Sequence, residues 1–203
     1  TGQLRLVRAL RGCAPVFVAP TGSEETELDF EARMLGDPLR AIAACWYWIR
    51  KLQAQYHEGA LDQAEASAER AGALLWTSTA DFELAEYHFF AALVCTALAT
   101  TGPAERATGR IEAARLHHAR LAAWARGCPA NFAHRAALVA AEIARVEGDP
   151  SRARQGYDDA VRLAREGAFH HHVGLGHELA ARFHAARGDE ASASMCRRLA
   201  GES

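Results

Sequence analysis

The chain has 203 residues and a formal net charge of −2; half of its residues are hydrophobic and 24% are charged. This balance is typical of a soluble globular protein and excludes an intrinsically disordered chain. The small net charge gives no electrostatic reason to expect nucleic acid or an anionic membrane as a partner. Abundant alanine and only 6 prolines favour close-packed helices over sheets.

The cysteines exclude two common kinds of structural site. Their count is 5, an odd number, and they form neither a CxxC motif nor paired spacings, which argues against a disulfide framework and a zinc knuckle. Cys45 and Cys95 lie among apolar residues and are expected to be small buried side chains. With no signal peptide and no apolar run long enough to span a membrane, we expect a cytoplasmic protein. The chain begins without Met, in the style of a helix interior, and is expected to be part of a longer protein.

Residues 1–36 are expected to form an N-terminal region distinct from the rest of the chain. It would contain the end of a helix, a loop over residues 13–27 with two prolines and an acidic cluster, and a short helix over residues 27–35. Asp37 and Pro38 then suit the N-cap and the first position of the next helix.

Residues 37–203 are expected to form one repeat domain, because four glycines divide it at similar intervals. The intervals are 43, 46 and 40 residues, and each glycine is followed by an alanine five residues later. The glycines are Gly59, Gly102, Gly148 and Gly188, and the alanines are Ala64, Ala107, Ala153 and Ala193. A unit that recurs at this length is typical of stacked helical hairpins.

Helices are expected in antiparallel pairs, because only two to five residues separate successive helical stretches. The expected pairs are 38–57 with 60–76, 81–101 with 103–127, 131–147 with 150–167, and 170–187 with 189–200. They predict an all-α fold, a right-handed tetratricopeptide-like superhelix of about four hairpins.

The third pair shows the repeat spacing best. After Gly148, the residues Ala153, Tyr157 and Ala160 follow at +5, +9 and +12, as in a tetratricopeptide repeat. Alanine suits the points where two helix backbones cross closely, and an aromatic ring fills the wedge beside them. The intervals exceed the roughly 34 residues of the standard repeat, so an irregular superhelix is expected.

Five strings resemble the helical repeat region of large bacterial multidomain signalling kinases. They are residues 46–54 (WYWIRKLQA), 74–78 (LLWTS), 85–93 (AEYHFFAAL), 128–134 (CPANFAH) and 178–183 (ELAARF). In that family a serine/threonine-kinase-like domain and an AAA-type ATPase precede the repeats, and a GAF domain and a histidine-kinase module follow. The resemblance extends over nearly the whole chain. It implies a non-catalytic, regulatory or protein-interaction scaffold in a cytoplasmic sensor histidine kinase of a two-component signal-transduction system.

No catalytic motif of that family is present in the chain. The sequence lacks a GxxxxGK[ST] phosphate loop, a His-Arg-Asp catalytic loop and a glycine-rich nucleotide lid. We therefore expect no enzymatic activity and no cofactor for this segment. The histidines of the last pair suggest a metal, but His177 and His184 are seven residues apart on one helix, about 10.5 Å, too far to share an ion. Capping and packing roles are expected for them, and a metalloenzyme is kept as a third alternative.

A docking face is expected on the first helices of the pairs, which line the concave side of such an array. Counted from the turn glycines, this face includes Trp46, Gln53, Tyr56, Phe89, Thr96, Arg135, Glu142, Arg145, Glu178 and Arg182. Its rings and charges suit an extended peptide or a flanking domain of the same polypeptide as partner, and a homodimer is left open. The alternative interpretation is that the rings are core residues and the charges form ion pairs within the array.

The sequence is also consistent with a second function. The same helical architecture suits a ligand- or partner-responsive domain of an ATPase-containing transcriptional regulator. A neighbouring helix-turn-helix module would favour that function, whereas a GAF or histidine-kinase module would favour the sensor kinase.

Overall fold

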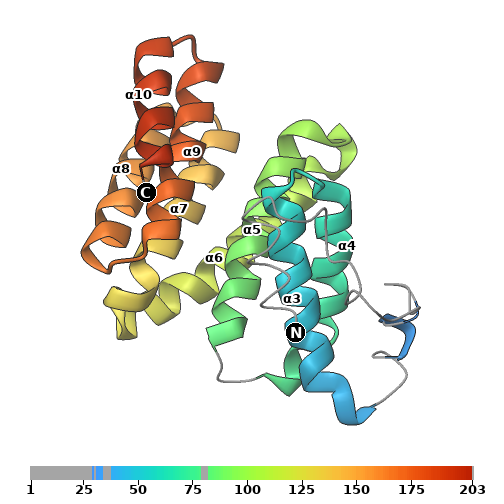
Figure 1. Ribbon diagram of the computed structural model, residues 1–203. Helices are drawn as coiled ribbons and strands as arrows, with labels where there is room; N and C mark the ends of the chain where they lie inside the picture. The colour runs from blue at the N-terminus through green and yellow to red at the C-terminus, as the bar shows by residue number, and fades with distance from the viewer. Residues whose placement is uncertain (1–28, 30, 34–37, 79–81, 203) are drawn as a thin grey trace. The chain divides into compact units, whose positions relative to one another are not determined.

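The computed structural model describes residues 29, 31–33, 38–78 and 82–202, and every regular element in these ranges is helical (Figure 1). The all-α class is therefore confirmed. The elements are η1 (Pro38–Arg40), α3 (Ala41–His57), α4 (Leu61–Gly72), η2 (Leu75–Thr77), α5 (Phe82–Thr101), η3 (Ala104–Arg106), α6 (Ala107–Gly127), α7 (Pro129–Val146), α8 (Pro150–Glu166), α9 (His170–Ala186) and α10 (Glu190–Gly201). Each of the eight helices expected over residues 38–200 is present, with boundaries close to those predicted.

Three expected helices are shorter than predicted, because one end of each is a 3₁₀ turn. The helix expected over 38–57 starts as η1 and becomes α-helical at Ala41. The helix expected over 60–76 ends at Gly72, where a β-carbon would lie 2.9 Å from the Tyr87 hydroxyl, and η2 follows it. The helix expected from residue 103 starts as η3 and becomes α-helical only at Ala107.

The expected N-terminal region lies mostly outside the described residues. Asp29 and residues 31–33 are helical, as the short helix predicted, whereas the expected helix end, the loop over 13–27 and the Asp37 cap are outside the described part. The predicted boundary between residues 36 and 37 stays a prediction.

The chain divides into two compact units, residues 1–94 and 95–203, and the division falls within α5. In the first unit α3 packs against α4, with the Trp48, Ile49 and Leu52 side chains fully buried. In the second unit each helix from α6 to α10 packs against the next one, and α9 also contacts α7 (Figure 1). The α9–α10 hairpin therefore stacks on the α7–α8 hairpin.

Three of the four predicted turn glycines end their helix in the left-handed conformation. Gly59, Gly148 and Gly188 all have φ near +76°. At each, the glycine N–H and the next N–H donate back to carbonyls three and five residues earlier, as in Asp149 N–H to Ala144 O at 2.9 Å. This pattern is the Schellman motif, which favours glycine because a β-carbon is strained at positive φ.

Gly102 also follows the end of its helix, as predicted, but glycine is needed there for another reason. Its φ is not positive, unlike that of the other three glycines, and its N–H donates to Leu98 O at 2.9 Å. A β-carbon here would collide with the Arg110 guanidinium, which donates to the same carbonyl at 3.1 Å. Glycine is therefore needed for space rather than for backbone conformation.

The alanines that follow the turns mark close helix contacts in three of four cases. Ala64, Ala153 and Ala193 have no exposed surface, whereas Ala107 is only half-buried. In the third pair Tyr157 and Ala160 are also buried, as the repeat spacing predicted. The alanine at +5 therefore lies where the second helix of a hairpin meets its neighbours.

α5 is long and apolar enough to cross a membrane by length and composition. The expectation that no apolar run reaches this length was therefore wrong. Most of this stretch is buried inside the fold, including Phe89, Phe90 and Leu93, as in the core helix of a soluble protein.

Candidate functional site

The residues expected on the docking face differ widely in exposure. Six of them have less than a tenth of their surface exposed, so a partner cannot reach them in this structure; they are Gln53, Tyr56, Phe89, Thr96, Arg135 and Glu142. Trp46, Glu178 and Arg182 are exposed and Arg145 is half-buried. For these four residues a docking role stays a prediction.

In the first unit, the buried members of the set belong to the core. The Tyr56 and Phe90 rings pack edge to face with centroids 5.6 Å apart. Gln53 accepts from the Arg50 guanidinium at 2.7 Å and donates to the Glu86 carboxylate. A buried amide requires hydrogen-bond partners, and Gln53 finds them in Arg50 and Glu86. The bond to Glu86 joins α3 to α5.

In the second unit, the charged members pair with one another. Arg145 donates through Nε and Nη2 to Glu142 at 3.1 and 2.7 Å, and the Tyr157 hydroxyl donates to the same carboxylate. Burial, together with the Glu142 charge, raises the pKa of Tyr157, so the phenol stays protonated as the donor. Glu178 and Arg182 form an exposed i,i+4 pair. The alternative interpretation, ion pairs within the array, is confirmed for these residues.

Arg135 is fully buried and serves the fold. Its Nη1 donates to Asn131 O at 2.6 Å, and its guanidinium lies 5.3 Å from the centre of the Phe169 ring. The neighbouring His134 stacks on the same ring at 4.3 Å and lies 2.8 Å from His172, between ring nitrogens Nε2 and Nδ1. This cluster joins α7 to the start of α9.

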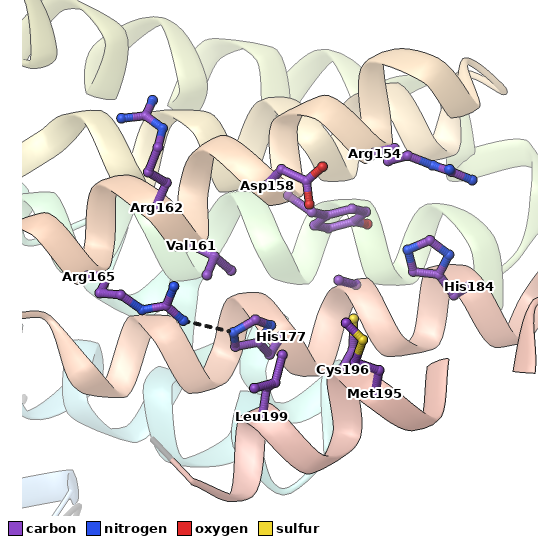
Figure 2. A pocket seen from close by; sticks show the side chains of 12 residues that line it. Arg154, Asp158, Val161, Arg162, Arg165, His177, His184, Met195, Cys196 and Leu199 are labelled. Carbon is purple, nitrogen blue, oxygen red and sulfur yellow. Dashed lines mark hydrogen bonds between the residues drawn. The ribbon is translucent and has the colours of Figure 1, made fainter. Parts of the chain in front are cut away.

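The structure instead places a pocket of about 290 Å³ between α8, α9 and α10 (Figure 2). Its lining comes from one stripe of each helix. The lining residues are Arg154, Tyr157, Asp158, Val161, Arg162 and Arg165 of α8, His177, Ala180 and His184 of α9, and Met195, Cys196 and Leu199 of α10. Along α9 these residues are spaced i, i+3 and i+7, which places them on one helix face. The pocket is thus a product of the hairpin stack.

The two histidines of the pocket are held by contacts within the fold. His177 Nε2 lies 3.5 Å from Arg165 Nη2 (Figure 2), and burial, reinforced by the Arg165 charge, lowers the pKa of His177. His184 Nδ1 lies 3.1 Å from Asp189 Oδ2, and Asp189 caps α10 by accepting from the Ser192 N–H. The expected packing and capping roles of His177 and His184 are therefore confirmed.

Burial and nearby charges set the chemistry of the groups that line the pocket. Burial raises the pKa of the Cys196 thiol, and the nearby carboxylates Asp158 and Asp189 raise it further, so the thiolate nucleophile is disfavoured. Over the described ranges, no three His, Cys, Asp or Glu side chains lie close enough together to hold a metal ion. What the pocket does present is guanidinium groups beside apolar side chains, which suit a ligand with negative charge.

Sequence reasoning missed this pocket. It selected Glu178 and Arg182 on α9, whereas the pocket is lined by His177 and Ala180, one or two positions away around the helix. The three arginines that line the pocket, Arg154, Arg162 and Arg165, recur along α8 at spacings of eight and three, and this pattern is a signal that the sequence contains.

Comparison of the chain with protein-family models, with curated proteins and with solved structures gives no match.

Proposed function

We propose that this chain is a non-catalytic scaffold for protein interaction, built as a tetratricopeptide-like superhelix of stacked hairpins. The observation that carries the proposal is a turn unit that recurs after 40 residues in the stacked hairpins of the second unit. In both copies a left-handed glycine precedes an aspartate that caps the next helix, Asp149 accepting from Arg152 N–H at 3.0 Å and Asp189 from Ser192 N–H at 3.1 Å.

Stacked repeats favour a binding role for a physical reason. Each hairpin contacts mainly its neighbours in the chain, so the array remains extended and leaves long faces open to partners. In this chain α9 contacts both α7 and α8, which is the contact pattern of a hairpin added to a stack. The irregular superhelix and its concave face are part of the proposal.

The first unit offers an exposed apolar surface suited to a protein partner. Ile42 and Trp46 follow one another by one turn of α3, with 51% and 42% of their surfaces exposed. The Trp46 indole N–H is held by Ser78 Oγ at 3.1 Å, so its ring is fixed in place. A fixed, exposed tryptophan is a common anchor at protein interfaces.

The sequence strings that resemble the signalling kinases supply the context. We assign the scaffold to a cytoplasmic bacterial sensor histidine kinase, where it would couple an upstream ATPase-like module to downstream sensing. Its partners would be the flanking domains, with neither nucleic acid nor membrane as a ligand and with self-association as a further option.

Crosslinking in the full-length protein tests this function. Crosslinks are expected between this segment and its flanking domains, and Trp46→Ala should reduce them. Trp76→Ala is the matched control, because Trp76 is 72% exposed but lies outside the predicted face. The proposal is contradicted if no crosslinks form. It is also contradicted if both variants keep their helicity and lose crosslinks to the same extent. A helix-turn-helix module in place of the kinase modules would favour the transcriptional regulator.

A further inference from the structure

We propose that the pocket between α8, α9 and α10 binds an extended acidic peptide segment, with one carboxylate at each end of the pocket and an apolar side chain between them. The proposal specifies the chemistry of the ligand, and it rests on the proposed function in that the chain is a binding module. The arrangement of charged side chains along α8 supports it.

Two arginines at the ends of the pocket are available to a ligand. Arg154 and Arg165 both line it, and Figure 2 shows Arg154 near His184 and Arg165 beside His177. In the described part of the chain no carboxylate oxygen lies within 4.0 Å of either guanidinium. The Arg165 guanidinium contacts His177 at 3.5 Å, and this ring is neutral at pH 7 because burial lowers the pKa of His177 below its usual value.

The third arginine of the pocket is already occupied. Arg162 pairs with Asp159 at 3.2 Å and with Glu166 at 3.0 Å, both on its own helix. The available positive charge is therefore confined to the two ends of the α8 stripe. Asp158 lies between them and repels a carboxylate at the centre, so the pocket discriminates by the spacing of the ligand's charges.

Apart from Asp158, the middle of the pocket is lined by apolar side chains. Val161 and Ala180 are buried there, and Leu199 and the 55% exposed Met195 reach it from α10. Methionine adapts to ligands of different shape, and an exposed apolar side chain beside a pocket gains from being covered. An aliphatic side chain of the ligand therefore suits this part.

The distance between the ends selects a peptide over a small acid. Arg154 and Arg165 are 11 residues apart on α8, which is about 16 Å at roughly 1.5 Å per residue. An extended peptide covers this distance with about five residues at roughly 3.3 Å each. A small carboxylic acid would reach one arginine only. The preferred segment is therefore acidic, apolar in the centre, and acidic again four or five residues on.

Titration of the purified chain with a fluorescein-labelled peptide tests the proposal. The probe has seven residues, with two glutamates four positions apart around a central leucine. Saturable binding is expected, and the double variant Arg154→Gln with Arg165→Gln should weaken it at least tenfold. A probe with glutamine for both glutamates, and hexanoate as a small acid, should both bind at least tenfold more weakly than the acidic peptide.

Arg120→Gln with Arg126→Gln is the control for charge alone, because both arginines are exposed on α6 outside the pocket. This control should change the affinity less than twofold. The proposal is overturned by no saturable binding up to 1 mM, by equal weakening in the two double variants, or by hexanoate binding as tightly as the peptide. Helicity by circular dichroism verifies that each variant is folded. Crosslinking to the flanking domains does not depend on this pocket. If the peptide does not bind but the crosslinks still form, the peptide site is refuted and the scaffold function is not.

Discussion

Ala168 is the one described non-glycine residue with positive φ, at 57°. It ends α8 as the glycines end other helices, with Ala168 N–H donating to Arg165 O at 3.1 Å and Phe169 N–H to Ala164 O at 2.8 Å. The glycine of this turn stands one position earlier, because a β-carbon at Gly167 would lie 2.8 Å from the Phe169 ring. Glycine is thus needed for space at position 167, while the left-handed position 168 carries an alanine.

Ala168→Gly should therefore stabilise the protein by about 1 kcal/mol, since it relieves the strain of a β-carbon in the left-handed region. Urea unfolding followed by circular dichroism measures the change. Gly167→Ala is the matched control and should destabilise the protein through its contact with Phe169. A neutral or destabilising Ala168→Gly would show that the turn is not strained.

Tyr157 carries a buried hydrogen bond to Glu142, which also binds Arg145. Tyr157→Phe should cost about 1–3 kcal/mol of unfolding free energy, because a buried carboxylate loses a donor. Arg182→Met, which breaks an exposed ion pair, should cost less than about 0.5 kcal/mol. Urea denaturation of both variants measures the two losses of unfolding free energy. Equal losses would mean that the buried network stabilises the protein no more than the exposed ion pair does.

At the scale of elements, the approach of α7 and α8 depends on a glycine within a helix. A β-carbon added at Gly156 would lie 2.8 Å from the Ala141 β-carbon and 3.0 Å from its α-carbon. The two helices therefore meet with almost no side chain between them. The alanine spacing predicted a close contact in this pair, and Gly156 lies at such a contact.

Gly156→Ala should destabilise the protein by about 1–3 kcal/mol, because the overpacking outweighs the gain in helix propensity. Gly109→Ala in α6 is the matched control. Gly109 is exposed with nothing within 4 Å of an added β-carbon, so alanine there should stabilise by about 0.5–1 kcal/mol. Thermal unfolding of the two variants gives the sign of each change, and a stabilising Gly156→Ala would contradict the close contact.

At the scale of the whole molecule, stability should depend on pH through buried histidine. His134 is 2% exposed, and burial, then the charges of Arg135 and His171, lowers its pKa from about 6.5 to about 3. The folded state thus holds the neutral ring while the unfolded chain takes up a proton. The stability from this group is complete above pH 6.5 and falls as the pH decreases from 6.5 toward 3.

The loss should approach about 1.4 kcal/mol per pH unit for one proton well below pH 6.5. His134→Gln should make the plot of unfolding free energy against pH shallower by about one proton between pH 6 and 4, measured in urea. Val139→Ala removes buried packing without removing a titrating group and should keep the wild-type slope. An unchanged slope in His134→Gln would refute the assignment.

The sequence alone determined the helices and most of their ends. Caps and turns involve only neighbouring residues, so the spacing predicted the turns at Gly59, Gly148 and Gly188. The structure adds that all three glycines have left-handed φ. The spacing did not show why glycine is needed at positions 102 and 167, which packing decides. Arg110 fills the space at Gly102, and the Phe169 ring excludes a side chain at Gly167.

The tertiary structure decided which side of each helix is open to a partner. Spacing gives the period of a helix face but not its direction, and each residue turns the face by about 100°. Counting therefore placed Phe89 and Arg135 on a docking face, whereas neighbouring elements cover both completely. The pocket beside α9 follows from three helices meeting, a relation between segments distant in the chain that no local pattern contains.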